Sequence, residues 1–163
     1  ATYMVWQAEQ NIRMPAEPDQ QELFWRDQAG VKTGILNCHR WGDVGDNIAS
    51  GSFRTLGMVI IPCSMSTVGK IAAGLSSDLL ERAADVQMKE GKPLVVVPRE
   101  TPFSLIHLRN LTTLAEAGVK IVPAIPAWYH HPKTIEDLVD FVVARTLDTL
   151  DIDCIPLERW KSS

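Results

Sequence analysis

The sequence predicts an α/β domain built on a parallel sheet. Three apolar runs, at 58–61, 94–97 and 119–122, each end in a proline, and helical patterns lie between them. Strand, helix and strand in this order form a right-handed crossover in nearly all known cases, so the three strands are expected to run parallel. With 163 residues, 45% of them hydrophobic and 22% charged, the chain is long enough for one domain with its own core.

The alternation of strands and helices begins after the first 57 residues, which are less regular. Residues 3–6 look like the end of a strand, and 7–14 look like a short helix stopped by Pro15. A second helix is predicted over 19–28, closed by Gly30, and a short strand over 34–38. The glycine-rich stretch 41–53 has few apolar residues and is predicted to be a functional loop.

From residue 58 the elements alternate. The continuous apolar runs are typical of strands covered on both faces, and the proline after each run is expected to stop the ladder. Helices are predicted over 68–73, 78–90, 104–117 and 134–150, the last with an apolar stripe from Ile135 to Leu150. The loops after the strands, at 63–67, 99–102 and 124–131, therefore gather on one rim of the sheet, where open α/β sheets bind ligands.

The first rim loop carries three small hydroxyl residues, Ser64, Ser66 and Thr67, before a helix. Loop N–H groups, hydroxyls and the helix macrodipole can together hold an anion. An ordinary N-capped helix explains the same residues, because serine and threonine are common caps.

The other rim loops carry the remaining polar candidates. Arg99 and Glu100 follow the second strand; they either neutralise each other or bind an anion and transfer a proton. The third loop contains Tyr129, a candidate ligand contact, and two adjacent histidines that are expected to point apart, so no metal is predicted.

Three further cations lie on predicted helices. Arg82 and Lys89 are seven residues apart and share a face, with Asp85 between them, which is also the pattern of a solvated ion-pair face. Arg145 lies at the edge of the apolar stripe, where it either extends to solvent or is held for a ligand.

The composition excludes several classes of protein. The formal net charge of −4 argues against non-specific nucleic-acid binding. No apolar run approaches the roughly 20 residues of a membrane span, and the start has no signal-peptide pattern. Cys38, Cys63 and Cys154 are odd in number and widely spaced, which fits neither disulfides nor zinc and favours a reducing cytoplasm.

Several motifs together resemble the UbiX/Pad-type flavin prenyltransferases. They are Pro62-Cys63-Ser64-x-x-Thr67, Glu81-Arg82-Ala83-Ala84-Asp85-Val86-x-x-Lys89-Glu90, Pro98-Arg99-Glu100-Thr101-Pro102, Ile106-His107-Leu108-x-Asn110, Pro126-Ala127-Trp128-Tyr129 and the terminal Arg159-Trp160. The resemblance covers 47–160, which implies one flavin-binding domain over 1–163 whose part at 1–46 is divergent or truncated.

The resemblance implies a three-layer flavodoxin-like fold, a homo-oligomer that is usually a dodecamer, and no metal. It implies transfer of a dimethylallyl group from dimethylallyl phosphate to N5 and C6 of reduced FMN. The product, prenylated FMN, is the cofactor of UbiD-type decarboxylases.

The resemblance also assigns roles to individual residues. It implies that Glu100 transfers protons and that Glu100, Lys89 and Arg145 gather in one rim pocket, with some contacts open to supply by a neighbouring subunit. Ser50, matched to an active-site serine beside the flavin, and Lys89 are implied to be catalytic with Glu100. The residues matched to flavin binding are Ser64, Met65, Ser66, Thr67 and Arg99. Those matched to dimethylallyl phosphate are Tyr129 and Arg145, with Arg82 and Lys89 adding positive charge.

One departure from the family pattern affects the expected activity. The family begins with a strand and a Gly-x-Thr/Ser-Gly-Ala-Ser-Gly loop, and this first βα unit is absent from the sequence. One possibility is that the sequence is partial; this is favoured, because losing a central parallel strand would expose much apolar surface. The other is that the protein has lost the unit, in which case activity is doubtful. Two alternatives remain open: a non-catalytic FMN-binding protein, and a flavin-dependent decarboxylase of peptidyl cysteine or phosphopantothenoylcysteine.

Overall fold

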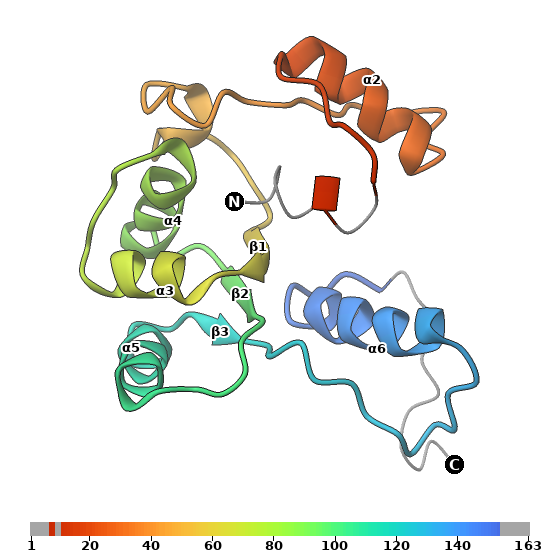
Figure 1. Ribbon diagram of the computed structural model, residues 1–163. Coiled ribbons are helices and arrows are strands. Elements are labelled where there is room, and N and C mark those ends of the chain that lie inside the picture. Colours follow the sequence, from red (N-terminus) through yellow and green to blue (C-terminus); the bar gives the residue numbers. More distant parts are fainter. Residues whose placement is uncertain (1–6, 9–10, 154–163) are drawn as a thin grey trace.

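Three parallel strands form the sheet, as predicted. The structure is a computed structural model that describes residues 7–8 and 11–153 (Figure 1). Strand β1 (Met58–Cys63) pairs with β2 (Leu94–Pro98), and β2 pairs with β3 (Lys120–Ile121), all parallel and in the order β1-β2-β3. The strand predicted over 3–6 and the Arg159-Trp160 match lie outside the described residues.

Helices cover both faces of the sheet, which confirms the flavodoxin-like class. Figure 1 shows α3 (Met65–Ala72), α4 (Leu79–Lys89) and α5 (Leu105–Glu116) on one face of the sheet and α6 (Ile135–Asp148) on the other. Each begins directly after a serine, threonine or aspartate whose side chain accepts a hydrogen bond from a backbone N–H in the first turn.

The core lies between β2 and the helices α3, α4 and α5. Every residue of β2 is buried, as a central parallel strand requires. Leu94 and Val96 point into a cluster that includes Val68 of α3, Ala84 of α4 and Leu114 of α5. This packing holds the N-terminus of α3 beside the ends of the strands.

The first strand differs from its prediction in two ways. β1 is not covered on both faces: it lies at the edge of the described sheet, and Ile61 is 49% exposed. Pro62 does not end the strand but lies inside it, at a register shift between Ile60 and Cys63. A proline is tolerated there because an edge strand leaves one side of its backbone unpaired.

The part before β1 is less regular than predicted. Helix α2 (Pro18–Gln28) confirms the predicted 19–28 helix, and Gly30 follows it at a φ of +61°. The strand predicted over 34–38 is absent, and the helix predicted over 7–14 does not include 11–14. The stretch 41–53 consists of turns and one short 3₁₀ helix, η1 (Asn47–Ala49).

The apolar stripe predicted for α6 is only partly buried. Ile135 and Val139 are exposed, whereas the buried positions of the helix are Ala144 and Thr146. No helix in the described part of the chain is long and apolar enough to cross a membrane.

Candidate active site

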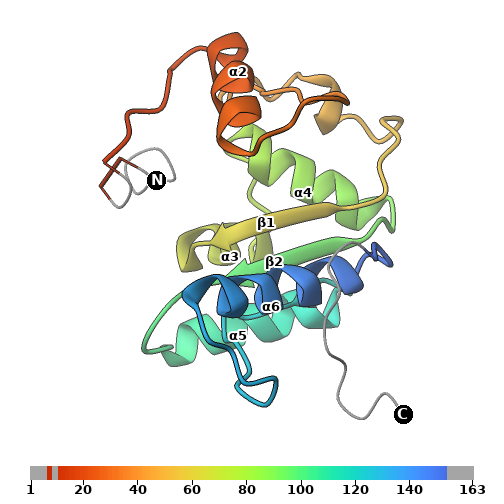
Figure 2. The same cartoon turned by 90° about the vertical axis from the view of Figure 1, so that its right-hand side faces the viewer.

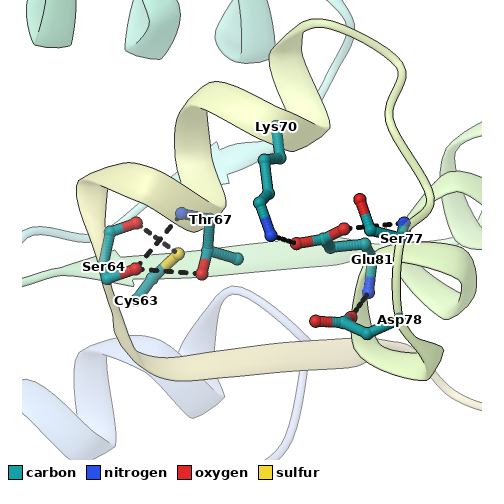
Figure 3. Close-up of polar contacts among 7 residues, drawn as sticks. All are labelled: Cys63, Ser64, Thr67, Lys70, Ser77, Asp78 and Glu81. Atoms are coloured by element: carbon teal, nitrogen blue, oxygen red, sulfur yellow. Dashed lines mark hydrogen bonds and ion pairs between the residues drawn. The ribbon is translucent and has the colours of Figure 1, made fainter. Parts of the chain in front are cut away.

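The N-terminus of α3 follows directly after the end of β1 and is polar. The Ser64 side chain caps the helix: its Oγ accepts a hydrogen bond from Thr67 N–H at 3.1 Å and lies 3.0 Å from Thr67 Oγ1 (Figure 3). The helix begins at Met65, so Ser66 and Thr67 belong to its first turn and not to the predicted loop. The Met65 side chain is buried, which leaves only its backbone for a ligand. The cap and the anion-binding arrangement are therefore compatible, since first-turn N–H groups and hydroxyls remain available.

The loop after β2 lies against this turn. The backbone N–H of Arg99 donates to the carbonyl oxygen of Cys63 at 3.4 Å, which joins the two strand ends. The Arg99 side chain is exposed, and Glu100 Oε1 accepts the Thr101 N–H at 3.1 Å. No ion pair joins Arg99 to Glu100, both of which the structure describes, so mutual neutralisation is not observed. The Arg99 backbone therefore lies beside the strand end that leads into α3, and its side chain is open to solvent.

Cys63, immediately before this turn, is not a nucleophile. Its thiol is buried and approaches the Ser64 carbonyl oxygen at 3.7 Å (Figure 3). Burial raises the pKa of Cys63 to about 11, so the reactive thiolate is scarce at neutral pH.

The third loop also reaches the same rim. Ala124 N–H donates to the carbonyl oxygen of Pro98 at 3.1 Å, and beyond it Tyr129 is 43% exposed with its ring edge-on to Phe141. His130 stacks on Phe141, whereas His131 is exposed, so the two histidines do differ in environment as expected. Among residues 7–8 and 11–153, no group of three or more His, Cys, Asp or Glu side chains is placed to hold a metal.

Other predicted site residues lie at the opposite end of the strands, where β1 and β2 begin. Lys89 ends α4, five residues before β2 begins at Leu94, and its Nζ lies 3.8 Å from Glu90 Oε1. The Ser50 loop lies beside it, since Lys92 Nζ donates to the Gly51 carbonyl oxygen at 3.1 Å. Figure 2 shows α4 ending and β1 and β2 beginning on the same side. Glu100 follows the other end of β2, about 13 Å further along the strand at 3.3 Å per residue.

The two remaining arginines are engaged in ion pairs. Arg82 Nη1 lies 3.2 Å from Asp85 Oδ2 on α4, which is the ion pair that the i,i+3 spacing of these residues allowed. Arg145 Nη1 lies 2.8 Å from Asp148 Oδ2 near the end of α6. Arg145 is four residues beyond Phe141, against which Tyr129 packs, or about 6 Å of helix.

One chain therefore brings only part of the predicted site together. The turn from Ser64 to Thr67 lies with Arg99 and Glu100 at the carboxyl ends of the strands. Lys89 precedes β2 and Glu100 follows it, so within one chain the length of this strand separates these two residues. The gathering of Glu100, Lys89 and Arg145 in one pocket stays a prediction.

Glu81 was missed by sequence reasoning. A glutamate in the first turn of a helix normally reads as a surface charge that complements the macrodipole. Its side chain is instead 2% exposed and contacts Lys70 of α3, which no local pattern indicates.

Comparison with known proteins identifies the family. A family model described as Flavoprotein matches residues 18–147. The flavin prenyltransferase UbiX of Synechocystis sp. is 76% identical over 162 residues, covering 99% of this chain and 79% of the relative. The chain belongs to the UbiX family of flavin prenyltransferases.

Two solved UbiX-type structures agree with this fold at a TM-score of 0.74 each. One is a dodecameric FMN-dependent UbiX-like decarboxylase from Escherichia coli O157:H7, 50% identical, covering 76% of this chain and 67% of that one. The other is AnUbiX (PadA1) in complex with FMN and dimethylallyl pyrophosphate, 46% identical, covering 77% and 66%. Both support FMN as the flavin of this UbiX family member.

Proposed function

We propose that the protein is a flavin prenyltransferase that uses dimethylallyl phosphate to prenylate reduced FMN at N5 and C6. The observation that carries this proposal is the 76% identity to the Synechocystis UbiX over nearly the whole chain. The AnUbiX complex, with FMN and an allylic pyrophosphate bound together in a protein of the same fold, supports the pairing of substrates.

The carboxyl-end cluster is assigned to the flavin. Ser64, Ser66, Thr67 and the backbone of Met65 would hold an anionic part of FMN, because first-turn N–H groups and hydroxyls converge there. Arg99 extends from the neighbouring strand end and would contact the flavin. A bound reduced flavin supplies the nucleophilic N5 and C6 atoms; everything else must come from the protein.

Glu100 is assigned to proton transfer. Prenylation at C6 requires the ring proton at C6 to leave, and Glu100 is a partly buried carboxylate one residue from the flavin-contacting arginine. Its Oε1 accepts the Thr101 N–H at 3.1 Å, and within the described residues Oε2 has no hydrogen bond and stays available as an acceptor.

The three cations outside the carboxyl-end cluster are proposed to act across a contact between copies. Breaking the allylic C–O bond leaves growing negative charge on the phosphate, which arginine, lysine and tyrosine donors stabilise. Arg82, Lys89 and Arg145 supply this chemistry, and Ser50 a hydroxyl, but only from a neighbouring subunit. The dodecameric E. coli structure is a protein of the same fold in which such contacts are possible.

Delivery of prenylated FMN to a UbiD-type decarboxylase, in the cytoplasm, completes the proposed role.

A second candidate is an FMN-dependent decarboxylase, favoured by the description of the E. coli relative. A flavin-binding protein without turnover is the third.

One experiment distinguishes these functions. The purified protein is incubated under anaerobic conditions with reduced FMN and dimethylallyl phosphate. The flavin is then released, and its molecular mass is measured by mass spectrometry. The proposal expects a flavin heavier by one dimethylallyl unit, and far less of it from Glu100→Gln. Flavin binding with no heavier flavin would overturn prenyl transfer in favour of the third candidate. Release of carbon dioxide from a cysteine-containing acid would favour the second.

A further inference from the structure

Glu81 is a buried charge that the proposed reaction does not use. It is the only buried acidic or basic side chain in the part of the chain that the structure describes. Both carboxylate oxygens have donors: Oε1 accepts from Lys70 Nζ at 2.7 Å, and Oε2 accepts from Ser77 N–H at 2.8 Å (Figure 3). Burial raises the pKa of Glu81, but these hydrogen bonds outweigh burial and leave the pKa below its ordinary value. The side chain is therefore an ionised, fully bonded link.

This link joins two helices. Lys70 lies in α3, one turn beyond Thr67, and Glu81 lies in the first turn of α4, where its N–H donates to the capping Asp78 at 2.8 Å. Figure 3 shows the Ser64–Thr67 contacts at the start of α3 and the Lys70–Glu81 contact further along the same helix.

α3 needs such a link. It has only eight residues, and helices of about two turns are marginal unless packing fixes them. Its buried face is narrow, formed by Met65, Val68 and Ile71, and it follows an edge strand with an irregular register. Rotation about its axis would turn the Ser64–Thr67 hydroxyls away from any ligand.

We propose that Glu81 is a positioning residue: through Lys70 it fixes the orientation of α3 and so the aim of its N-terminal anion site. This rests on the proposed function, because the anion is taken to be the phosphate of FMN. Lys70 itself does not bind the flavin in this proposal, since its ammonium group is engaged by the carboxylate on α4.

The test uses Glu81→Gln, Lys70→Met and the double variant. FMN affinity is measured by quenching of flavin fluorescence well below the unfolding temperature. Each single variant is expected to weaken FMN binding about 5- to 20-fold, less than the loss of about 10- to 150-fold expected for a direct charge-assisted bond, because these residues act on FMN only through the orientation of α3. The double variant is expected to be no weaker than the worse single one, because the two residues act as a unit. Thr134→Ala, which removes the cap of α6 on the other face, is the matched control; it is expected to lower stability while leaving FMN affinity unchanged.

A second readout needs no flavin. Hydrogen exchange at the Thr67 and Val68 amides is expected to be about 5- to 20-fold faster in Glu81→Gln than in the wild type, and unchanged in Thr134→Ala. Unchanged exchange in Glu81→Gln would overturn the positioning role, whatever the flavin results. Unchanged FMN affinity in both single variants would overturn it too. Wild-type protein that binds no FMN would instead contradict the proposed function, with the exchange data still deciding the link between the helices.

Discussion

Ser64→Ala separates the capping role of this residue from its proposed flavin role. Two effects are expected. The side chain caps α3 through Thr67 N–H at 3.1 Å, and removal of such a cap costs about 1 kcal/mol of unfolding free energy. In a domain of this size that lowers Tm by about 2–4 °C. The hydroxyl proton is also the group that would be donated to an anion, and loss of such a charge-assisted bond costs about 1.5–3 kcal/mol, or about 10- to 150-fold in Kd for FMN.

Ser104→Ala is the matched control. Ser104 caps α5 in the same way, accepting His107 N–H at 3.2 Å, but it does not belong to the α3 turn. Both variants are expected to lose similar Tm, measured by thermal denaturation, whereas only Ser64→Ala should lose FMN affinity, measured by fluorescence titration. Equal Kd values for the two variants would refute an anion site at α3 and leave Ser64 as a structural cap alone.

Four further outcomes are expected. Glu100→Gln should keep the Kd for FMN within about twofold and lower turnover by about 10²- to 10⁴-fold, the usual contribution of a general acid–base group; unchanged turnover would remove Glu100 from the reaction. Leu114→Ala, at a position 1% exposed, should cost about 2–5 kcal/mol in urea unfolding, whereas Leu108→Ala, at a position 48% exposed, should cost under about 0.5 kcal/mol. Cys63 should resist iodoacetamide at pH 8 in the native state and react in urea, read by peptide mass spectrometry, because a pKa of about 11 leaves about one thiolate in a thousand; rapid native labelling would contradict its burial. Backbone N–H groups at the start of α6 lower the pKa of Asp137, so its contribution to stability is complete above about pH 5 and disappears as the pH falls through the folded-state value. Asp137→Asn should therefore lower Tm more at pH 7 than at pH 2.5, and an equal loss at both would reject the linkage.

The central part of the fold could be read from the sequence because each local signal agreed with the global one. The apolar run at 94–97 became a fully buried strand, and Ser104 marks where α5 begins, as predicted. The predicted strand at 34–38 failed because strand formation depends on a neighbour. Ile35 is 90% exposed, and the stretch bonds side chains of α2 instead of another strand: Cys38 N–H donates to Glu22 Oε1 at 2.8 Å, and the Gly34 carbonyl oxygen accepts from Arg26 at 2.9 Å. A short apolar run cannot report whether a partner strand lies beside it.

The first turn of α3 was misplaced for a related reason. Serine and threonine compete with the backbone for hydrogen bonds and are poor helix formers, so Ser66 and Thr67 read as loop. Capping by Ser64 reverses that preference, because its side chain bonds the very N–H groups that a loop would leave to water. Glu81 shows the same limit: its partner Lys70 is eleven residues away on another helix, and only packing brings them together.

The separation of the site residues, in contrast, was contained in the order of the chain. A helix that leads directly into a parallel strand must end near the end of the sheet where that strand begins. Lys89, just before β2, therefore lies at the end where the strands begin. Glu100, just after β2, lies at the other end. No rearrangement of side chains closes a gap of about 13 Å of strand, since the sheet between them is the most buried part of the molecule. Both residues can therefore act on one substrate only if that substrate spans the strand or if a second copy of the chain supplies one of them.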